Sequence, residues 1–170
     1  MDLKSKIRDI PDFPKPGIIF KDITPLLQDG EAFCYAVKQL ADIFSTERVD
    51  VVLGPEARGF ILGAPVAVAL GVGFIPVRKK GKLPGPTICG EYDLEYGKDT
   101  VEMHCSAITP GQRVVIIDDL LATGGTIAAT IKMVEQAGGT VVGVGLLIEL
   151  LELEGRKVLA KYAVQSLLQY

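Results

Sequence analysis

The sequence predicts an α/β fold in which helices flank a mostly parallel β-sheet. Short apolar runs typical of buried strands alternate with longer segments of helical periodicity, and the sequence has no internal repeat and no low-complexity linker. A chain of 170 residues fits one domain over 1–170 and buries roughly 70% of the surface exposed by its unfolded form. The predicted fold therefore needs no disulfide scaffold.

The first half of the chain predicts three strands and two helices. A short strand covers residues 17–23, and buried strands cover 48–54 and 72–79. Between these strands lie a helix over 31–44 and another over 60–71, the second preceded by the turn "PEARG". The first helix has an apolar face with three- and four-residue spacing, formed by Phe33, Val37, Leu40, Ala41 and Phe44.

The second half begins with a long segment that lacks apolar periodicity. Residues 79–100 gather glycine, proline and charge, which predicts a long flexible loop with room for one hairpin, acting as a lid. Strands follow at 99–107, at 114–118 and at 140–150. The helix between the last two strands has Ile127, Ile131 and Val134 on its apolar face and stops at Gly138.

Charge and cysteine usage exclude several classes of protein. The net charge is −3, so no global positive field favours nucleic acid or an anionic membrane. The first residues lack the apolar run of a signal peptide, and no apolar run reaches the roughly 18 residues of a membrane span. The cysteines Cys34, Cys89 and Cys105 are odd in number and far apart, which favours free thiols in a reducing compartment. We therefore expect a cytoplasmic protein.

The stretch "VVIIDDLLATGGTI", residues 114–127, carries the strongest functional signal. In open α/β sheets, ligands bind at the carboxyl ends of the strands, where Asp118 and Asp119 follow a buried strand. The glycine-containing turn after them can direct backbone N–H groups and a helix N-terminus at a phosphate. Two acids would repel a lone phosphate, but they suit the hydroxyls of a sugar that carries one. The pattern therefore predicts a ribose 5-phosphate site rather than an ordinary helix cap.

This stretch resembles the signature of the type I phosphoribosyltransferases, and the chain is similar to the adenine phosphoribosyltransferase family within them. Four further blocks match that family in the right order: "IPDFPKPGIIFKDI", "GPEARGF", "PVRKKGKLPG" and "YDLEYGKD". The resemblance covers essentially the whole chain. It implies the type I phosphoribosyltransferase fold with an N-terminal hood over 1–30, a lid over 79–100 and a homodimer.

The resemblance also implies the reaction. Adenine displaces pyrophosphate from C1 of 5-phosphoribosyl 1-diphosphate to give AMP, with Mg²⁺ held mainly by substrate and water rather than by the protein. The acid pair would bind the ribose hydroxyls and favour the positive charge that builds on the ribose ring. The implied 5-phosphate site is Ala122, Thr123, Gly124, Gly125 and Thr126.

Cationic and backbone donors elsewhere are implied to bind the diphosphate. The loop after the strand at 48–54 supplies Glu56, Ala57, Arg58 and Gly59. The basic run "RKKGK" supplies Arg78, Lys79 and Lys82, while Lys80 is expected to be a bystander. Arginine suits a diphosphate because its planar guanidinium presents several donors at once.

The base site and the lid complete the implied site. Phe20 would stack on the purine, with Leu120 on the opposite face, while Ile19 and Lys21 read its edge through main-chain groups. Many members of the family have arginine at the position of Lys21, which main-chain recognition tolerates. Glu95, with Tyr96 in the lid, would exchange a proton with the purine as its N9 attacks C1, and lid closure would exclude water.

Two alternatives share this fold and stay open. Another purine or orotate phosphoribosyltransferase would keep the ribose and phosphate chemistry but differ in the hood and the lid. A nucleotide-sensing regulator would lack catalysis and would need a basic nucleic-acid face or an added DNA-binding domain. The negative net charge and the adenine-type blocks favour the enzyme.

Overall fold

The computed structural model describes residues 1–93 and 97–170, which form one large β-sheet and one small one. The strands of the large sheet are β3 (Val51–Pro55), β4 (Gly73–Lys79), β5 (Thr87–Asp93), β6 (Lys98–His104), β7 (Arg113–Leu121), β8 (Thr140–Glu149) and β9 (Val164–Gln169). They lie in the order β5-β6-β4-β3-β7-β8-β9. The five strands from β4 to β9 in this order are parallel, and β6 pairs antiparallel with both β4 and β5. The predicted mostly parallel sheet is confirmed.

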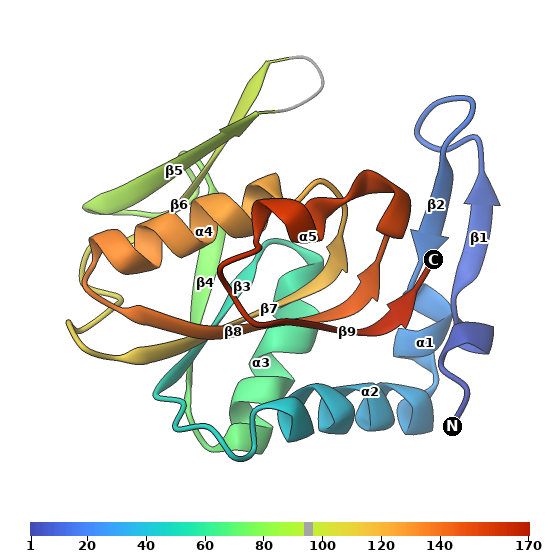
Figure 1. Cartoon of the computed structure of the whole chain (residues 1–170), viewed down its shortest axis with the longest axis horizontal. Coiled ribbons are helices and arrows are strands. Elements are labelled where there is room, and N and C mark those ends of the chain that lie inside the picture. The colour runs from blue at the N-terminus through green and yellow to red at the C-terminus, as the bar shows by residue number, and fades with distance from the viewer. Residues whose placement is uncertain (94–96) are drawn as a thin grey trace.

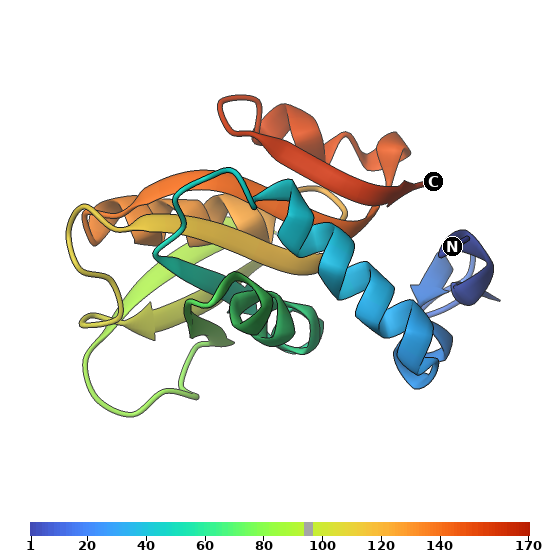
Figure 2. The ribbon, with the colours of Figure 1, turned by 90° about the horizontal axis from the view of Figure 1, so that it is seen from below.

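Helices cover both faces of this sheet (Figures 1 and 2). The helical elements are η1 (Lys4–Lys6), α1 (Thr24–Gln28), α2 (Gly30–Ile43), α3 (Arg58–Leu70), α4 (Gly125–Gln136), η2 (Leu151–Leu153) and α5 (Gly155–Val158). α2 and α3 pack on one face, and α4 with α5 on the other. Within the described ranges, no helix is both long and apolar enough to cross a membrane.

The central strands are apolar throughout because both of their faces are buried. Successive side chains of a strand point to opposite faces, so Val52 and Val115 pack under α2 and α3 while Leu53 and Ile116 pack under α4. All four side chains are fully buried. Strands of a parallel sheet covered on both sides have this continuous apolar pattern. The buried strands fix the polar residues at one edge of the sheet, where Glu56 follows β3 and the two acids lie in β7.

Within the predicted N-terminal hood over 1–30, β1 (Arg8–Pro11) and β2 (Ile19–Asp22) form a hairpin, which lies beside the C-terminus (Figure 1). The ring of Tyr170 lies between two ammonium groups, with Lys21 Nζ 4.0 Å and Lys4 Nζ 4.4 Å from its centroid. The Leu151 N–H donates to the carbonyl of Tyr170 over 2.9 Å. The last residue of the chain thus connects the hood to the large sheet.

The predicted helices and strands are confirmed to within a few residues, and the main differences lie where contacts are distant in sequence. Much of the expected 79–100 loop is strand, because β5 pairs with β6 along its whole length. Gly90 in β5 lies under α4, where a Cβ would meet the Ala129 carbonyl at 2.8 Å. β9 and α5 were not predicted. These elements depend on tertiary pairing, which local periodicity does not encode.

Candidate active site

The two adjacent acids are buried at the end of β7. Asp118 is 9% exposed and Asp119 is 6% exposed. Asp118 Oδ1 accepts the backbone N–H of Asp119 over 2.9 Å. A Cβ on residue 59 would lie 2.8 Å from this same oxygen, so Gly59 leaves the room that the carboxylate occupies at the start of α3. The strand end and the helix start therefore form one compact acidic site.

Burial and mutual repulsion make these acids hard to ionise. Burial raises the pKa of Asp118 well above its ordinary value, and the charge of Asp119 adds to the effect. Burial also raises the pKa of Asp119, although Arg58 opposes it. Arg58 Nε lies 2.9 Å from Asp119 Oδ2 as an ion pair. That buried oxygen accepts no hydrogen bond of good geometry from the described residues, and Arg58 is its charged neighbour.

The predicted phosphate loop follows the acids and turns directly into α4. Gly124 has φ +85°, a left-handed conformation that glycine adopts without strain, and it is the N-cap residue of α4. The backbone of α5 packs against this loop, where a Cβ on Gly155 would lie 2.2 Å from the Ala122 carbonyl. On the other side, a Cβ on Gly125 would lie 3.2 Å from the ring of Tyr92. The loop is thus held between a backbone and an aromatic ring.

The second loop of the site connects β3 to α3, and its Glu56 contacts two side chains of the basic run "RKKGK". Glu56 Oε2 accepts Arg78 Nε over 2.6 Å, and its Oε1 accepts Lys82 Nζ over 2.7 Å. Burial alone would raise the pKa of Glu56, but these two hydrogen bonds hold it below its ordinary value. Lys79 instead pairs with Asp99 over 2.8 Å. One carboxylate therefore holds two of the predicted diphosphate cations together.

Two adjoining cavities bring most of the predicted residues together. A cavity of about 290 Å³ is lined from the predicted set by Glu56, Ala57, Arg58, Lys79, Asp118, Asp119, Leu120 and Thr126. A larger one of about 930 Å³ is lined from that set by Lys79, Asp118, Leu120, Ala122, Thr123, Gly124, Gly125 and Thr126. The cavities share Tyr92 and, from the predicted set, Lys79, Asp118, Leu120 and Thr126, so the acids and both loops lie around two adjoining cavities.

Of the predicted base-binding residues, Leu120 lines both cavities, whereas Ile19, Phe20 and Lys21 line neither of them. The Arg58 guanidinium carbon is 5.1 Å from the centroid of the Phe20 ring, which links the hood to the β3–α3 loop. Ile19 is 55% exposed. Lys21 turns its ammonium to Asp9, 2.8 Å away, so only its main chain could read a base edge. Glu95 and Tyr96 lie outside the described residues.

Several residues around the site were not predicted. Tyr92 lines both cavities, and its hydroxyl donates to Asp99 over 3.0 Å. Its place in the "YDLEYGKD" block could have signalled this. Lys15, Ile18 and Leu153 line the larger cavity. Gly155 supports the phosphate loop from about thirty residues away, and no sequence pattern indicated it.

The side chains of the site are suited to a metal ion that binds mainly through the substrate. Within the described ranges, no group of three or more His, Cys, Asp or Glu side chains could hold a metal ion. Asp119 Oδ2 is a hard oxygen donor of the kind that hydrated Mg²⁺ accepts, and its ion pair with Arg58 would have to open for a metal-bound water to reach it. The residues therefore fit a Mg²⁺ ion bound through diphosphate and water.

A mostly parallel sheet with a buried acid pair and a glycine-containing loop into a helix at its carboxyl edge is the arrangement predicted for a phosphoribosyltransferase. The chain matches the Phosphoribosyl transferase domain family over residues 26–168. Its mostly parallel sheet with flanking helices is the type I fold of these enzymes.

Comparison with full-length relatives identifies the family within this class. The chain is 65% identical to a Clostridium perfringens adenine phosphoribosyltransferase, over 100% of this chain and 99% of that protein. The crystal structure of the Thermoanaerobacter pseudethanolicus adenine phosphoribosyltransferase matches with a TM-score of 0.97 at 55% identity, over 99% and 98% of the two chains. The Saccharomyces cerevisiae enzyme, complexed with adenine and an imino-altritol bisphosphate, matches with a TM-score of 0.92 at 38% identity, over 97% and 96%. This chain belongs to the adenine phosphoribosyltransferases.

Proposed function

We propose that this chain transfers the 5-phosphoribosyl group of 5-phosphoribosyl 1-diphosphate to adenine, releasing AMP and pyrophosphate for purine salvage. The observation that carries this function is the pair of adjoining cavities around the acid pair, the loop Ala122–Thr126 and the β3–α3 loop. A sugar bearing a phosphate at one end and a diphosphate at the other matches that order of groups. The yeast relative with bound adenine supports adenine as the acceptor.

The ribose and its 5-phosphate bind at the end of β7. Asp118 and Asp119 accept hydrogen bonds from the ribose hydroxyls, and the loop Ala122–Thr126 donates to the phosphate through its N–H groups and hydroxyls. As the bond from C1 to the diphosphate breaks, positive charge builds on the ribose. Two carboxylates buried beside it stabilise that charge more strongly than solvated acids would, because little water screens them.

The diphosphate binds at the second loop. Backbone groups of Glu56, Ala57 and Gly59 surround it together with the Arg58 guanidinium. Arg78 and Lys82, held by Glu56, and Lys79, held by Asp99, supply further positive charge. Since these cations are already ordered by carboxylates, binding the diphosphate costs less side-chain entropy than ordering free lysines would.

Magnesium is the proposed cofactor. The diphosphate and water would supply most of its ligands, and the carboxylate of Asp119 would accept a hydrogen bond from one of those waters. When bound, Mg²⁺ neutralises the charge of the departing diphosphate.

Adenine binds under the hood. Phe20 stacks on the purine and Leu120 packs on its other face, while the main chain of Ile19 and Lys21 reads its edge. Glu95 relays the proton that the purine loses when N9 attacks C1, and Tyr96 closes with it. The match of "YDLEYGKD" to the family supports this role. We expect Glu95→Gln to slow turnover while AMP affinity stays nearly unchanged, and unchanged turnover would remove Glu95 from the chemistry.

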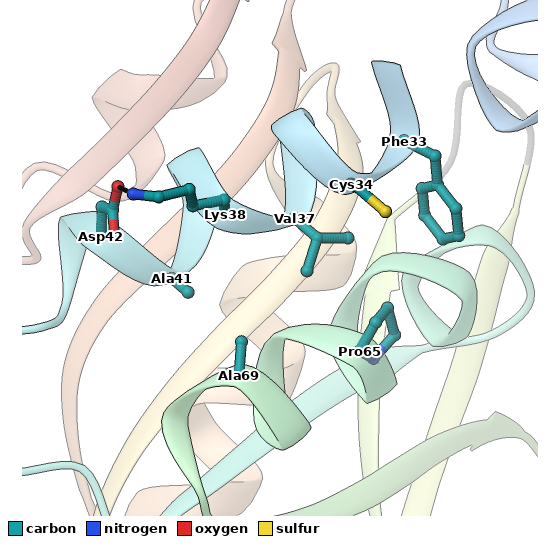
Figure 3. A pocket seen from close by; sticks show the side chains of 8 residues that line it. All are labelled: Phe33, Cys34, Val37, Lys38, Ala41, Asp42, Pro65 and Ala69. Carbon is teal, nitrogen blue, oxygen red and sulfur yellow. Dashed lines mark hydrogen bonds and ion pairs between the residues drawn. The ribbon is translucent and has the colours of Figure 1, made fainter. Parts of the chain in front are cut away.

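The proposal includes a homodimer, supported by an apolar face of α3. No charged residue occurs from Gly59 to Val77, yet Val68 is 80% exposed and Ile61 is 40% exposed. Exposed apolar surface of this kind is typical of protein contacts. Beside it a groove of about 360 Å³ separates α2 from α3 (Figure 3). The groove is lined by Phe33, Cys34, Val37, Lys38, Ala41, Asp42, Pro65 and Ala69.

We also propose a cytoplasmic location. Cys34, Cys89 and Cys105 are all free and exposed, as expected of thiols in a reducing compartment.

A base-specificity assay tests the proposed function. The purified protein receives Mg²⁺ and 5-phosphoribosyl 1-diphosphate with adenine, guanine, hypoxanthine or orotate in separate reactions. We expect AMP from adenine at a rate far above that of the other bases. Faster use of another base would assign a different phosphoribosyltransferase, and nucleotide binding without any product would favour the regulator.

A further inference from the structure

Glu102 in β6 is a buried carboxylate inside the most basic part of the chain. It is 4% exposed and lies opposite Arg78 in the pairing of β6 with β4. It has no ion pair with this neighbour, because Arg78 and Lys82 pair with Glu56. A buried carboxylate needs other compensation for its lost hydration.

That compensation comes from the loop that joins β4 to β5. Glu102 Oε1 accepts three successive backbone N–H groups, from Gly81 and Lys82 at 3.1 Å and from Leu83 at 3.0 Å. Its Oε2 accepts the Thr87 hydroxyl at 3.4 Å. Successive N–H groups that converge in this way form an anion-binding nest. Here a side chain from another strand fills the nest.

Hydrogen bonds rather than packing fix this loop. Leu83 is half-buried, and every other residue from 80 to 86 is exposed. Backbone bonds hold the two ends, from Lys80 N to the Thr100 carbonyl and from Cys105 N to the Pro86 carbonyl, and a longer turn bond runs from Lys82 N to the Lys79 carbonyl. In the middle of the loop, Glu102 accepts the backbone N–H groups of residues 81–83, and the Lys82 side chain extends from there to Glu56. Loss of the carboxylate would therefore free the loop with little effect on the core.

We propose that Glu102 is a positioning residue for the diphosphate. By fixing the backbone of residues 81–83, it keeps the Lys82 ammonium 2.7 Å from Glu56 at the edge of the cavity that contains the acid pair. Glu102 touches no substrate itself. This inference rests on the proposed function, since that function identifies the anion that Lys82 meets.

Three substitutions separate geometry from charge. Glu102→Ala removes the acceptor, Glu102→Asp keeps the charge but withdraws the oxygen by one methylene, and Glu102→Gln keeps an oxygen at the same reach without the charge. We expect Ala and Asp to raise the KM for 5-phosphoribosyl 1-diphosphate about tenfold and the KM for adenine less than about twofold. Gln should stay within about threefold of wild type for both substrates. Glu91→Ala is the matched control, because this glutamate of the same hairpin is 63% exposed.

Amide hydrogen exchange gives a second readout that does not depend on catalysis. The Gly81 and Leu83 amides should exchange faster in the Ala and Asp variants than in wild type and the Gln variant, because Glu102 is the hydrogen-bond acceptor of both. Equal rises in both KM values, wild-type KM values in the Asp variant, or a Gln variant as impaired as Asp would each overturn the proposal. If Glu102→Ala does not fold, the Asp and Gln variants still decide. Failure of wild type to form AMP would refute the proposed function instead. The exchange rates would still test whether Glu102 fixes the backbone of residues 81–83.

Discussion

The two ends of the proposed active site, the phosphate end at β7 and the diphosphate end at the β3–α3 loop, are built differently. At the phosphate end, the acids are under 10% exposed, and the loop after them is held between the Gly155 backbone and the Tyr92 ring. At the diphosphate end, the cations lie on side chains that are 34% exposed for Arg78 and 51% for Lys82, and they are held by ion pairs. One end depends on packed backbone and the other on partly solvated charge.

This difference determines how each end should respond to change. A packed backbone cannot shift without moving its neighbours, so small alterations at the phosphate end should be severe. Ion pairs near the surface are screened by water and salt and can be replaced by neighbouring charges. Alterations at the diphosphate end should therefore be milder and depend on ionic strength.

The largest expected effect comes from the acid pair. The double variant Asp118→Asn with Asp119→Asn should lose on the order of 1000-fold in kcat/KM, because two carboxylates that stabilise ribose charge become neutral. Its melting temperature should equal or exceed that of wild type, because burial raises the pKa of both acids and their charged forms therefore destabilise the fold. AMP formation and thermal unfolding test both parts, and an active double variant would refute the ribose assignment.

The support of the phosphate loop gives the next effect. Gly155→Ala would put a Cβ 2.2 Å from the Ala122 carbonyl, so the loop must move, and we expect kcat/KM to fall about 100-fold. Gly30→Ala is the matched control, because a Cβ there meets nothing within 4 Å. Steady-state kinetics on both variants measure the difference. Equal activities would show that the loop tolerates displacement.

The features of the site that could be predicted from sequence are the ones with local signals, and the ones that could not depend on contacts between distant segments. The strand, turn and helix start of residues 114–127 were predicted correctly because their signals are local: an apolar run, two acids and a glycine pair. The binding of ribose and phosphate there stays a prediction. The support from Gly155 and the anchor at Glu102 could not be predicted, since each joins segments far apart in the chain. Likewise, the basic run was assigned to the diphosphate, but its pairing with Glu56 depends on how β3 and β4 lie together.

An ion pair behind the phosphate loop should give a pH-dependent effect. Hydrogen bonds from Arg156 lower the pKa of Glu149 to about 2, and Arg156 follows Gly155 in α5. Because the pKa is depressed in the folded state, the stabilisation is complete above pH 4.5 and is lost as the pH falls toward 2. We expect the difference in unfolding free energy between wild type and Glu149→Gln to shrink by about 2 kcal/mol between pH 6 and pH 3. Urea unfolding at both pH values measures it, and a constant difference would contradict the pairing.

The smallest expected effect belongs to a single cation of the diphosphate end. Lys82→Ala should raise the KM for 5-phosphoribosyl 1-diphosphate about tenfold at low salt, because Arg78 remains beside Glu56. At 0.5 M salt the effect should fall toward twofold, since screening then acts within about 4 Å, whereas the Gly155→Ala defect should persist. Lys80→Ala is the control for nonspecific charge, because this exposed lysine lies in the same loop. An equal effect of the two lysine variants would mean that the loop acts through its overall field rather than through the ammonium that Glu56 holds.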